Sequence, residues 1–255
     1  MKSTLKMVLA VAIVLVGLNA MAEVNDSWTP SGNISVQVAT KNIHPTLSFD
    51  KYDKPQSLVD GWLNLPAGLA LELSEYAGLN NDNLDGDKGD EFDAALWEKI
   101  TLPENAYLKF RLKWCDGYPV QTANGKDAMA YDAFIGKSYK QGANKVTFEL
   151  RAEYWHYVQN VDKGMVSIVP NVTHEYQVGK FTAYDQLVLQ WNNELKPFGE
   201  LLSGQAKVGV KVKLTPNLTW NILDIWGITP ISPVEKGDPR QGQAVAFETM
   251  VTRTF

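Results

Sequence analysis

Residues 106–114 read Ala-Tyr-Leu-Lys-Phe-Arg-Leu-Lys-Trp, and this stretch decides the fold class. Every second side chain is apolar, and three of the side chains between them are cations, Lys109, Arg111 and Lys113. Side chains alternate between the two faces of an extended chain, so a strand here has one apolar and one basic face. A helix would spread the three cations around its circumference and would have no apolar stripe. The pattern therefore predicts a β-strand.

The same alternation recurs at residues 206–214, where lysines separate apolar residues, and more weakly at residues 146–153. The alternation alone does not decide which face is buried. In a soluble sheet the apolar face turns toward the core. In an outer-membrane barrel the apolar face meets lipid and the polar face lines the interior.

The start of the chain indicates export from the cytoplasm. Lys2 and Lys6 precede an apolar run over residues 7–18, and Ala20-Met21-Ala22 offers the small residues of a signal peptidase site. The run is shorter than the roughly 20 apolar residues that a membrane anchor needs. We therefore expect a signal peptide over residues 1–22 and a single β domain over residues 23–255.

Composition narrows the classes of partner and of fold. A net charge of -5 argues against nucleic-acid binding, and the single cysteine, Cys115, excludes an intramolecular disulfide. No later apolar run is long enough for a membrane helix. If the protein crosses a membrane, it does so as the strands of a closed barrel, which leaves no backbone group unpaired in lipid.

Turn signals divide the mature chain into about twelve expected strands. They cover residues 33–41, 45–52, 57–76, 91–101, 106–114, 128–139, 145–158, 165–178, 181–192, 205–215, 218–228 and 243–255. The third is too long for one straight strand, and Pro66 implies a kink, a bulge or an inserted segment. Short turns alternate with longer polar loops, as in transmembrane barrels. We predict an all-β, antiparallel up-and-down transmembrane β-barrel.

One acidic segment has part of a calcium-binding pattern. Asn81, Asn83, Asp85 and Gly86 copy some EF-hand positions. Phe92, however, stands where the bidentate glutamate is required, and flanking helices are absent. We expect residues 80–91 to form a solvated loop, with ordered calcium binding as the alternative, and we expect no metal or other cofactor.

Aromatic residues fall mostly near the expected strand ends, where the girdles of a membrane barrel lie. They are Trp97, Tyr107, Trp114, Tyr118, Tyr131, Tyr139, Tyr157, Tyr176, Tyr184, Trp191, Trp220 and Trp226. The chain ends on Phe255, which shares a strand face with Val251 and Phe247. This ending resembles the terminal-strand assembly signal of outer-membrane barrels, although Arg253 departs from its usual apolar pattern.

Taken together, these features resemble the small bacterial outer-membrane porins. The chain is most similar to the TorF-type porins, in which an acidic Gly/Asp loop leads into a strand that begins as Glu91-Phe92-Asp93 does. It is also similar in size to the twelve-stranded oligogalacturonate-specific porins. The resemblance implies an outer-membrane location. It also implies contact with outer-membrane lipid and with the barrel-assembly machinery, and passage of small solutes.

If the apolar faces meet lipid, the charged faces line the lumen. The basic candidates are Lys109, Arg111, Lys113, Arg151, Lys207, Lys211 and Lys213. The acidic candidates are Asp93, Asp132, Glu149 and Glu153. Unpaired cations would favour anions, which predicts a channel for passive diffusion of small anionic or neutral solutes. Alternatively, the cations pair with the carboxylates and hold a narrow barrel together.

We expect no catalytic activity. The chain has three histidines, His44, His156 and His174, and none has a serine two residues away, as the twelve-stranded outer-membrane phospholipases require. The sequence contains no nucleophile elbow, phosphate loop or zinc-ligand spacing. Two other classes stay open: a secreted soluble β-sandwich that binds carbohydrate, and a closed structural or adhesion barrel.

Overall fold

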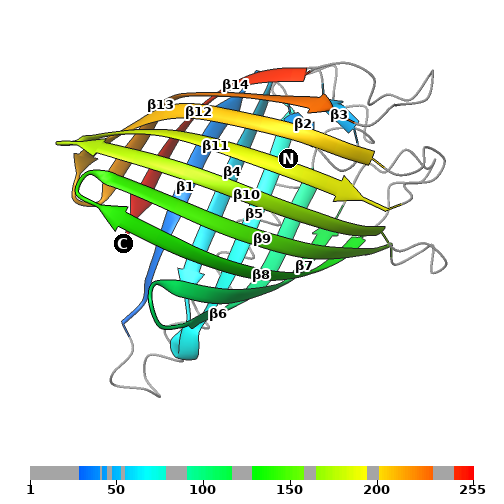
Figure 1. Cartoon of the computed structure of the whole chain (residues 1–255), viewed down its shortest axis with the longest axis horizontal. Helices are drawn as coiled ribbons and strands as arrows, with labels where there is room; N and C mark the ends of the chain where they lie inside the picture. The colour runs from blue at the N-terminus through cyan, green and yellow to red at the C-terminus, as the bar shows by residue number, and fades with distance from the viewer. Residues whose placement is uncertain are drawn as a thin grey trace.

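The protein forms a closed, all-antiparallel barrel in which twelve strands follow one another around the wall (Figure 1). The structure, a computed structural model, describes residues 29–40, 42–44, 48–52, 55–78, 91–116, 128–157, 165–193, 201–231 and 244–255. The barrel strands are β1 (Ser31–Ala39), β4 (Gln56–Asn64), β5 (Leu69–Gly78), β6 (Glu91–Thr101), β7 (Ala106–Asp116), β8 (Ala128–Gln141), β9 (Asn144–Tyr157), β10 (Met165–Val178), β11 (Phe181–Asn192), β12 (Leu201–Thr215), β13 (Leu218–Pro230) and β14 (Ala244–Thr254). The predicted fold class is confirmed, and a soluble sandwich of two sheets is wrong.

Two of the expected strands were wrong. One segment is not in the barrel and another forms two strands instead of one, so the barrel still has the expected twelve strands. The segment expected at residues 45–52 is outside the barrel, because β3 (Ser48–Tyr52) pairs only with β2 (Asn42–His44). The segment expected as one strand over residues 57–76 is instead two barrel strands, β4 and β5. Between them Pro66 opens a 3₁₀ turn, η1 (Pro66–Gly68), in which Gly68 has a φ of 79°. Proline lacks the N–H that a continuous strand would need, so the chain reverses here.

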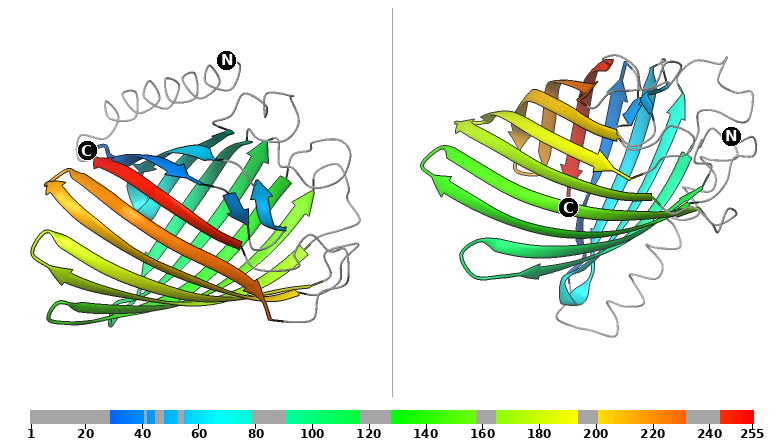
Figure 2. Two further views of the ribbon diagram at one scale, coloured as in Figure 1. Left: turned by 90° about the horizontal axis from the view of Figure 1, so that it is seen from above. Right: turned by 45° about the vertical axis from the view of Figure 1, so that its right-hand side comes forward.

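Tight turns collect at one end of the barrel, which we call the turn end, and the longer connections start from the opposite, loop end (Figure 1). Gly142 and Gly179 take positive φ values of 58° and 60° in two of these turns, a conformation that glycine adopts without strain. The first and last strands meet at the turn end, where Gly32 and Phe255 exchange two backbone hydrogen bonds of 3.1 Å (Figure 2). The predicted signal peptide and most of the acidic segment lie outside the described residues.

The outer surface of the barrel is apolar. Outward side chains such as Phe110, Leu112 and Leu187 are exposed, with 63% of the Leu187 surface accessible. Inward neighbours such as Asp93 and Asp132 are buried. This is the reverse of a soluble protein and suits a barrel whose outside meets lipid. Among the described residues, no helix is long and apolar enough to cross a bilayer.

The aromatic residues divide between the two faces of the wall. Tyr131 and Trp191 are exposed outward near the loop end, and Tyr139, Tyr176 and Trp220 near the turn end. These positions match two interfacial girdles.

Four of the residues expected in the girdles face the interior instead, and for these the expectation is wrong. They are Trp97, Tyr107, Tyr184 and Trp226, which align across the sheet with inward residues Arg111, Gly136, Gly209 and Lys207. Whether an aromatic side chain points inward or outward is set by the alternation of side chains along its strand, and not by its distance from the strand end.

Candidate functional site

The inward face of the barrel carries a network of paired charges, and most of the candidate lumen residues lie in it. All four acidic candidates and six of the seven basic ones form ion pairs there. The seventh, Lys213, is exposed near the turn end and forms no ion pair with another described residue. The sequence pattern therefore locates these charges on a common face, and the tertiary structure supplies their partners.

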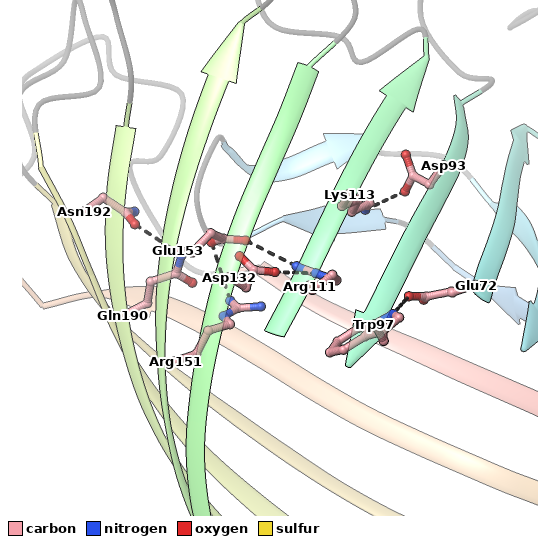
Figure 3. A network of polar contacts seen from close by, with 10 residues as sticks. All are labelled: Glu72, Asp93, Trp97, Arg111, Lys113, Asp132, Arg151, Glu153, Gln190 and Asn192. Carbon is pink, nitrogen blue, oxygen red and sulfur yellow. Dashed lines mark hydrogen bonds and ion pairs between the residues drawn. The ribbon is translucent and has the colours of Figure 1, made fainter. Parts of the chain in front are cut away.

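Strand register explains the centre of the network (Figure 3). Arg111 on β7 stands directly opposite Asp132 on β8, which in turn stands opposite Glu153 on β9. The Arg111 Nε donates to Asp132, and its Nη2 lies 3.5 Å from Glu153. The Asp132 side chain is completely inaccessible and that of Arg111 only 13% exposed. Charges buried this deeply require partners, and opposite charges on facing positions supply them.

Further pairs extend this cluster toward both ends of the barrel. Lys113 Nζ lies 2.5 Å from Asp93 on the loop side, and Lys109 Nζ lies 2.6 Å from Glu149 on the turn side. Arg151 approaches Glu153 at 3.7 Å. Every basic candidate on β7 and β9 therefore has a carboxylate nearby, and none presents a free positive charge.

Two inward carboxylates of β4 and β5 are held by neutral donors. The Trp97 Nε1 donates to Glu72 at 2.6 Å, and the Ser74 hydroxyl donates to Asp60 at 2.7 Å. Neither carboxylate forms an ion pair within the part of the chain that the structure describes. At these two carboxylates, neutral hydrogen-bond donors take the place of ion pairs.

A second ionic cluster lies on β9 to β14, and its acidic members were not among the residues predicted from the sequence. Glu175 binds Lys211 at 2.6 Å and Lys145 at 2.9 Å. Lys207 lies between Asp224 at 3.3 Å and Glu248 at 3.1 Å. Alternation within residues 244–254 could have identified Glu248. Asp224 was hidden because the register of β13 shifts between Asn221 and Asp224.

A tyrosine reaches across a glycine to an acid at two places on the inward face. Tyr107 lies over Gly136 and donates to Glu149 at 2.7 Å. Tyr184 lies over Gly209 in the same way, and the Asp224 carboxylate lies beside the same glycine. Each glycine lies on the strand between the tyrosine and the acid, and the tyrosine ring occupies the space where a side chain would otherwise be. A Cβ on either glycine would overlap the ring, so this arrangement depends on glycine.

Aromatic rings also surround the cations near the middle of the wall. Lys109 Nζ lies 4.6 Å from the centroid of Phe134, and the Arg111 guanidinium lies 5.0 Å from that of Trp97. Trp97 in turn packs against Trp62 at 5.3 Å between centroids. Cation–π contacts of this kind add to the ion pairs and restrict the motion of both cations.

Accessibility of the inward side chains falls from the turn end toward the loop end. Near the turn end, Lys145 and Lys211 have 46% and 33% of their side chains exposed. Further along, the neutral side chains of Ser167, Gln190 and Asn192 are inaccessible. Gln190 donates to Asn192 at 3.2 Å. Among the described residues, the least accessible inward side chains therefore lie in the loop-end half.

The only histidine whose side chain is described lies on the outside of the barrel. His174 Nδ1 is 3.1 Å from Asp185, and its Nε2 is 3.0 Å from Asn144. No serine takes part in this contact. Asp185 comes directly after an aromatic residue, as Asp93 and Asp132 do, yet it faces outward. Within the described ranges, no group of three or more His, Cys, Asp or Glu side chains could hold a metal ion.

Comparison with known proteins gives likeness of fold. No protein-family model matches the chain, and no curated protein matches its sequence. The NanC porin superposes with a TM-score of 0.54 at 8% identity, over 88% of this chain and 99% of that one. The KdgM porin, solved in complex with disordered oligogalacturonate, gives 0.50 at 8% identity over the same shares. The fold is that of bacterial outer-membrane β-barrels.

A third similar structure shows that this fold serves more than one role. The β domain of the Bordetella autotransporter BrkA superposes with a TM-score of 0.50 at 12% identity, over 89% of this chain and all of that domain. All three likenesses are likenesses of fold. At such low identity the comparisons establish the fold, and the function has to be argued from the interior.

Proposed function

We propose that the protein is a porin-like channel of narrow bore for passive diffusion of small solutes across the outer membrane. The observation that carries this proposal is the polar, charged interior that runs along the barrel from the accessible turn end. A purely structural barrel has no need for cations such as Lys145 and Lys211 that stay partly exposed inside it. The kinship with TorF-type porins, suggested by Glu91-Phe92-Asp93, is part of the same proposal.

Neutral solutes suit this interior better than anions. Most of the inward cations are paired with carboxylates, and Asp60 and Glu72 add two carboxylates that form no ion pair among the described residues. A wall of paired charges offers hydrogen bonds to a polar solute without a strong net field. We therefore propose weak ion selectivity, with small neutral solutes favoured over small anions.

Single-channel conductance in a planar bilayer tests this proposal. We expect small, stable steps and a reversal potential close to zero across a salt gradient. Solute entry into liposomes should be faster for small uncharged sugars than for sugar acids of equal size. A strongly anion-selective current would contradict the neutral-solute proposal, and absence of any step from inserted protein would contradict the channel itself.

A second candidate, a closed structural barrel, is favoured by one observation. The inward side chains of the loop-end half, including Asp132, Ser167 and Gln190, are almost or completely inaccessible. If they stay packed in the membrane, ions do not pass. Conductance separates the two candidates, since both predict a folded and inserted protein.

A further inference from the structure

The outer surface of the barrel has a groove that crosses β5 to β10, and we propose that it binds a phospholipid with an amine headgroup. The groove has a volume of about 570 Å³ and an apolar lining. Its floor is formed by Ala133 and Ala152, which face each other on β8 and β9. Small side chains at facing positions leave this space between larger neighbours.

Two rows of aligned residues define the direction of the groove. Leu96, Leu112, Tyr131 and Tyr154 follow one another across the strands and form one wall. The Tyr131 and Tyr154 rings lie 6.2 Å apart and close the wall on β8 and β9. The floor row contains Leu69, Glu98 and Phe110 before it reaches the two alanines.

The floor row rises from the turn end toward the middle of the barrel. Leu69 is the first residue of β5 after its turn, and Glu98 lies three residues before the end of β6. Ala152 lies eight residues into β9. The groove therefore begins at the turn-end interface and continues into the apolar belt, as a lipid does from its headgroup to its acyl chain.

Glu98 gives the groove a charged end. It is exposed on the outer surface and forms no ion pair among the described residues, in contrast to the paired carboxylates inside. A carboxylate on the lipid face is unfavourable unless it meets a cation or reaches the interface. A primary amine on a lipid headgroup would supply the opposite charge through a charge-assisted hydrogen bond. The turn end of such barrels is periplasmic, where the leaflet consists of phospholipid.

Native mass spectrometry of the protein, purified from outer membranes in detergent, tests this site. The probes are phosphatidylethanolamine and phosphatidylglycerol with identical acyl chains. We expect one phosphatidylethanolamine to be retained in preference to phosphatidylglycerol. Glu98→Gln should lower its retention roughly tenfold, because a charge-assisted contact is lost. Ala152→Leu should remove both lipids by filling the groove.

The matched controls for Glu98→Gln and Ala152→Leu are substitutions at and beside Asp185, a second acidic residue on the outer surface. Asp185 is also exposed on the outer surface but is already in hydrogen-bond contact with His174, so Asp185→Asn should leave lipid retention unchanged. Ala183→Leu fills space beside Asp185 and should also have no effect. If Ala152→Leu does not fold, as judged by heat-modifiable mobility on gels, Ala133→Val tests the same floor. Equal retention of the two lipids by the wild type, or an unchanged preference in Glu98→Gln, would overturn the proposal.

Discussion

The contact of Arg111 with Asp132 is the most deeply buried ion pair among the described residues. The two side chains stand on facing positions of β7 and β8, and the Asp132 carboxylate has no access to solvent. Removing one member of a buried pair leaves the other charge poorly compensated. Glu153, 3.5 Å from Arg111, replaces only part of the lost contact.

Asp132→Asn should therefore lower the free energy of unfolding by about 3 kcal/mol. Urea unfolding of the protein in lipid vesicles, followed by tryptophan fluorescence, measures this change. Glu104→Gln is the matched control, because Glu104 also pairs with a cation but is fully exposed in a turn. If the two variants unfold at the same urea concentration, the buried pair does not stabilise the barrel.

Glu104 itself gives a test of pH dependence outside the membrane-spanning strands. A hydrogen bond and the charge of Lys137 lower the pKa of Glu104 below its usual value. A carboxyl group with a lowered pKa stabilises the folded state above its unfolded pKa, and this contribution is lost as the pH falls through the folded pKa. In an NMR titration, the Glu104 carboxyl should titrate at a lower pH in the wild type than in Lys137→Met. Coincident titrations would show that the pair does not form.

At the scale of elements, the contact that links β7, β8 and β9 inside the barrel requires a glycine on β8. The Tyr107 ring occupies the place where Gly136 has no side chain, and from there its hydroxyl reaches Glu149 on the next strand. The ring therefore joins three strands across the interior. At Gly209 on β12, the Tyr184 ring from β11 and the Asp224 carboxylate from β13 likewise occupy the space that the glycine leaves free.

Gly136→Ala should displace the Tyr107 ring and lower the free energy of unfolding by about 1–3 kcal/mol, the usual effect of overpacking. Gly61→Ala is the control, since a Cβ there meets only the Leu73 carbonyl oxygen, at 3.8 Å. Chemical denaturation measures both variants. Combining Gly136→Ala with Tyr107→Ala should give less than the sum of the single effects, and strict additivity would argue against the contact.

The terminal strand offers a test of assembly that is separate from stability. Phe255 closes the seam between β1 and β14 through its backbone contacts with Gly32. We propose that its side chain also serves the barrel-assembly machinery. Phe255→Ala should reduce the amount of protein in the outer membrane several-fold, measured by membrane fractionation, while refolding into vesicles stays normal.

Phe181→Ala is the matched control for this experiment. Phe181 also lies at the turn end, and both residues are 53% exposed. If both variants accumulate normally, or if both fail to, the assembly role of Phe255 is wrong.

For the whole molecule, the balance of charge inside the barrel should decide ion selectivity. Lys207 neutralises Asp224 and Glu248 together, so Lys207→Met leaves two carboxylates without this cation. If ions pass, the reversal potential should shift toward cation preference. Glu248→Gln should shift it in the opposite direction, and Lys137→Met, which changes an exposed rim pair, should have little effect. Identical selectivity in all variants would place Lys207 away from the ion path.

The alternation of residues 106–114 predicted one strand and both of its faces, because strand geometry fixes the direction of each side chain. It also located Lys109, Arg111 and Lys113 on a common inward face. Trp97 and Tyr107 were expected in the aromatic girdle because they lie near strand ends. Alternation within their strands places both side chains on the inward face instead.

The sequence by itself determined an all-β barrel with an apolar outside, because alternation and turn signals are local properties of the chain. Only the tertiary structure decided which charges meet, since strand register pairs residues as distant as Lys207 and Glu248. Register also decided that Pro66 separates two strands and that β3 is not part of the barrel. For function, the sequence predicted a positively charged lumen, whereas in the structure carboxylates pair with six of the seven candidate cations.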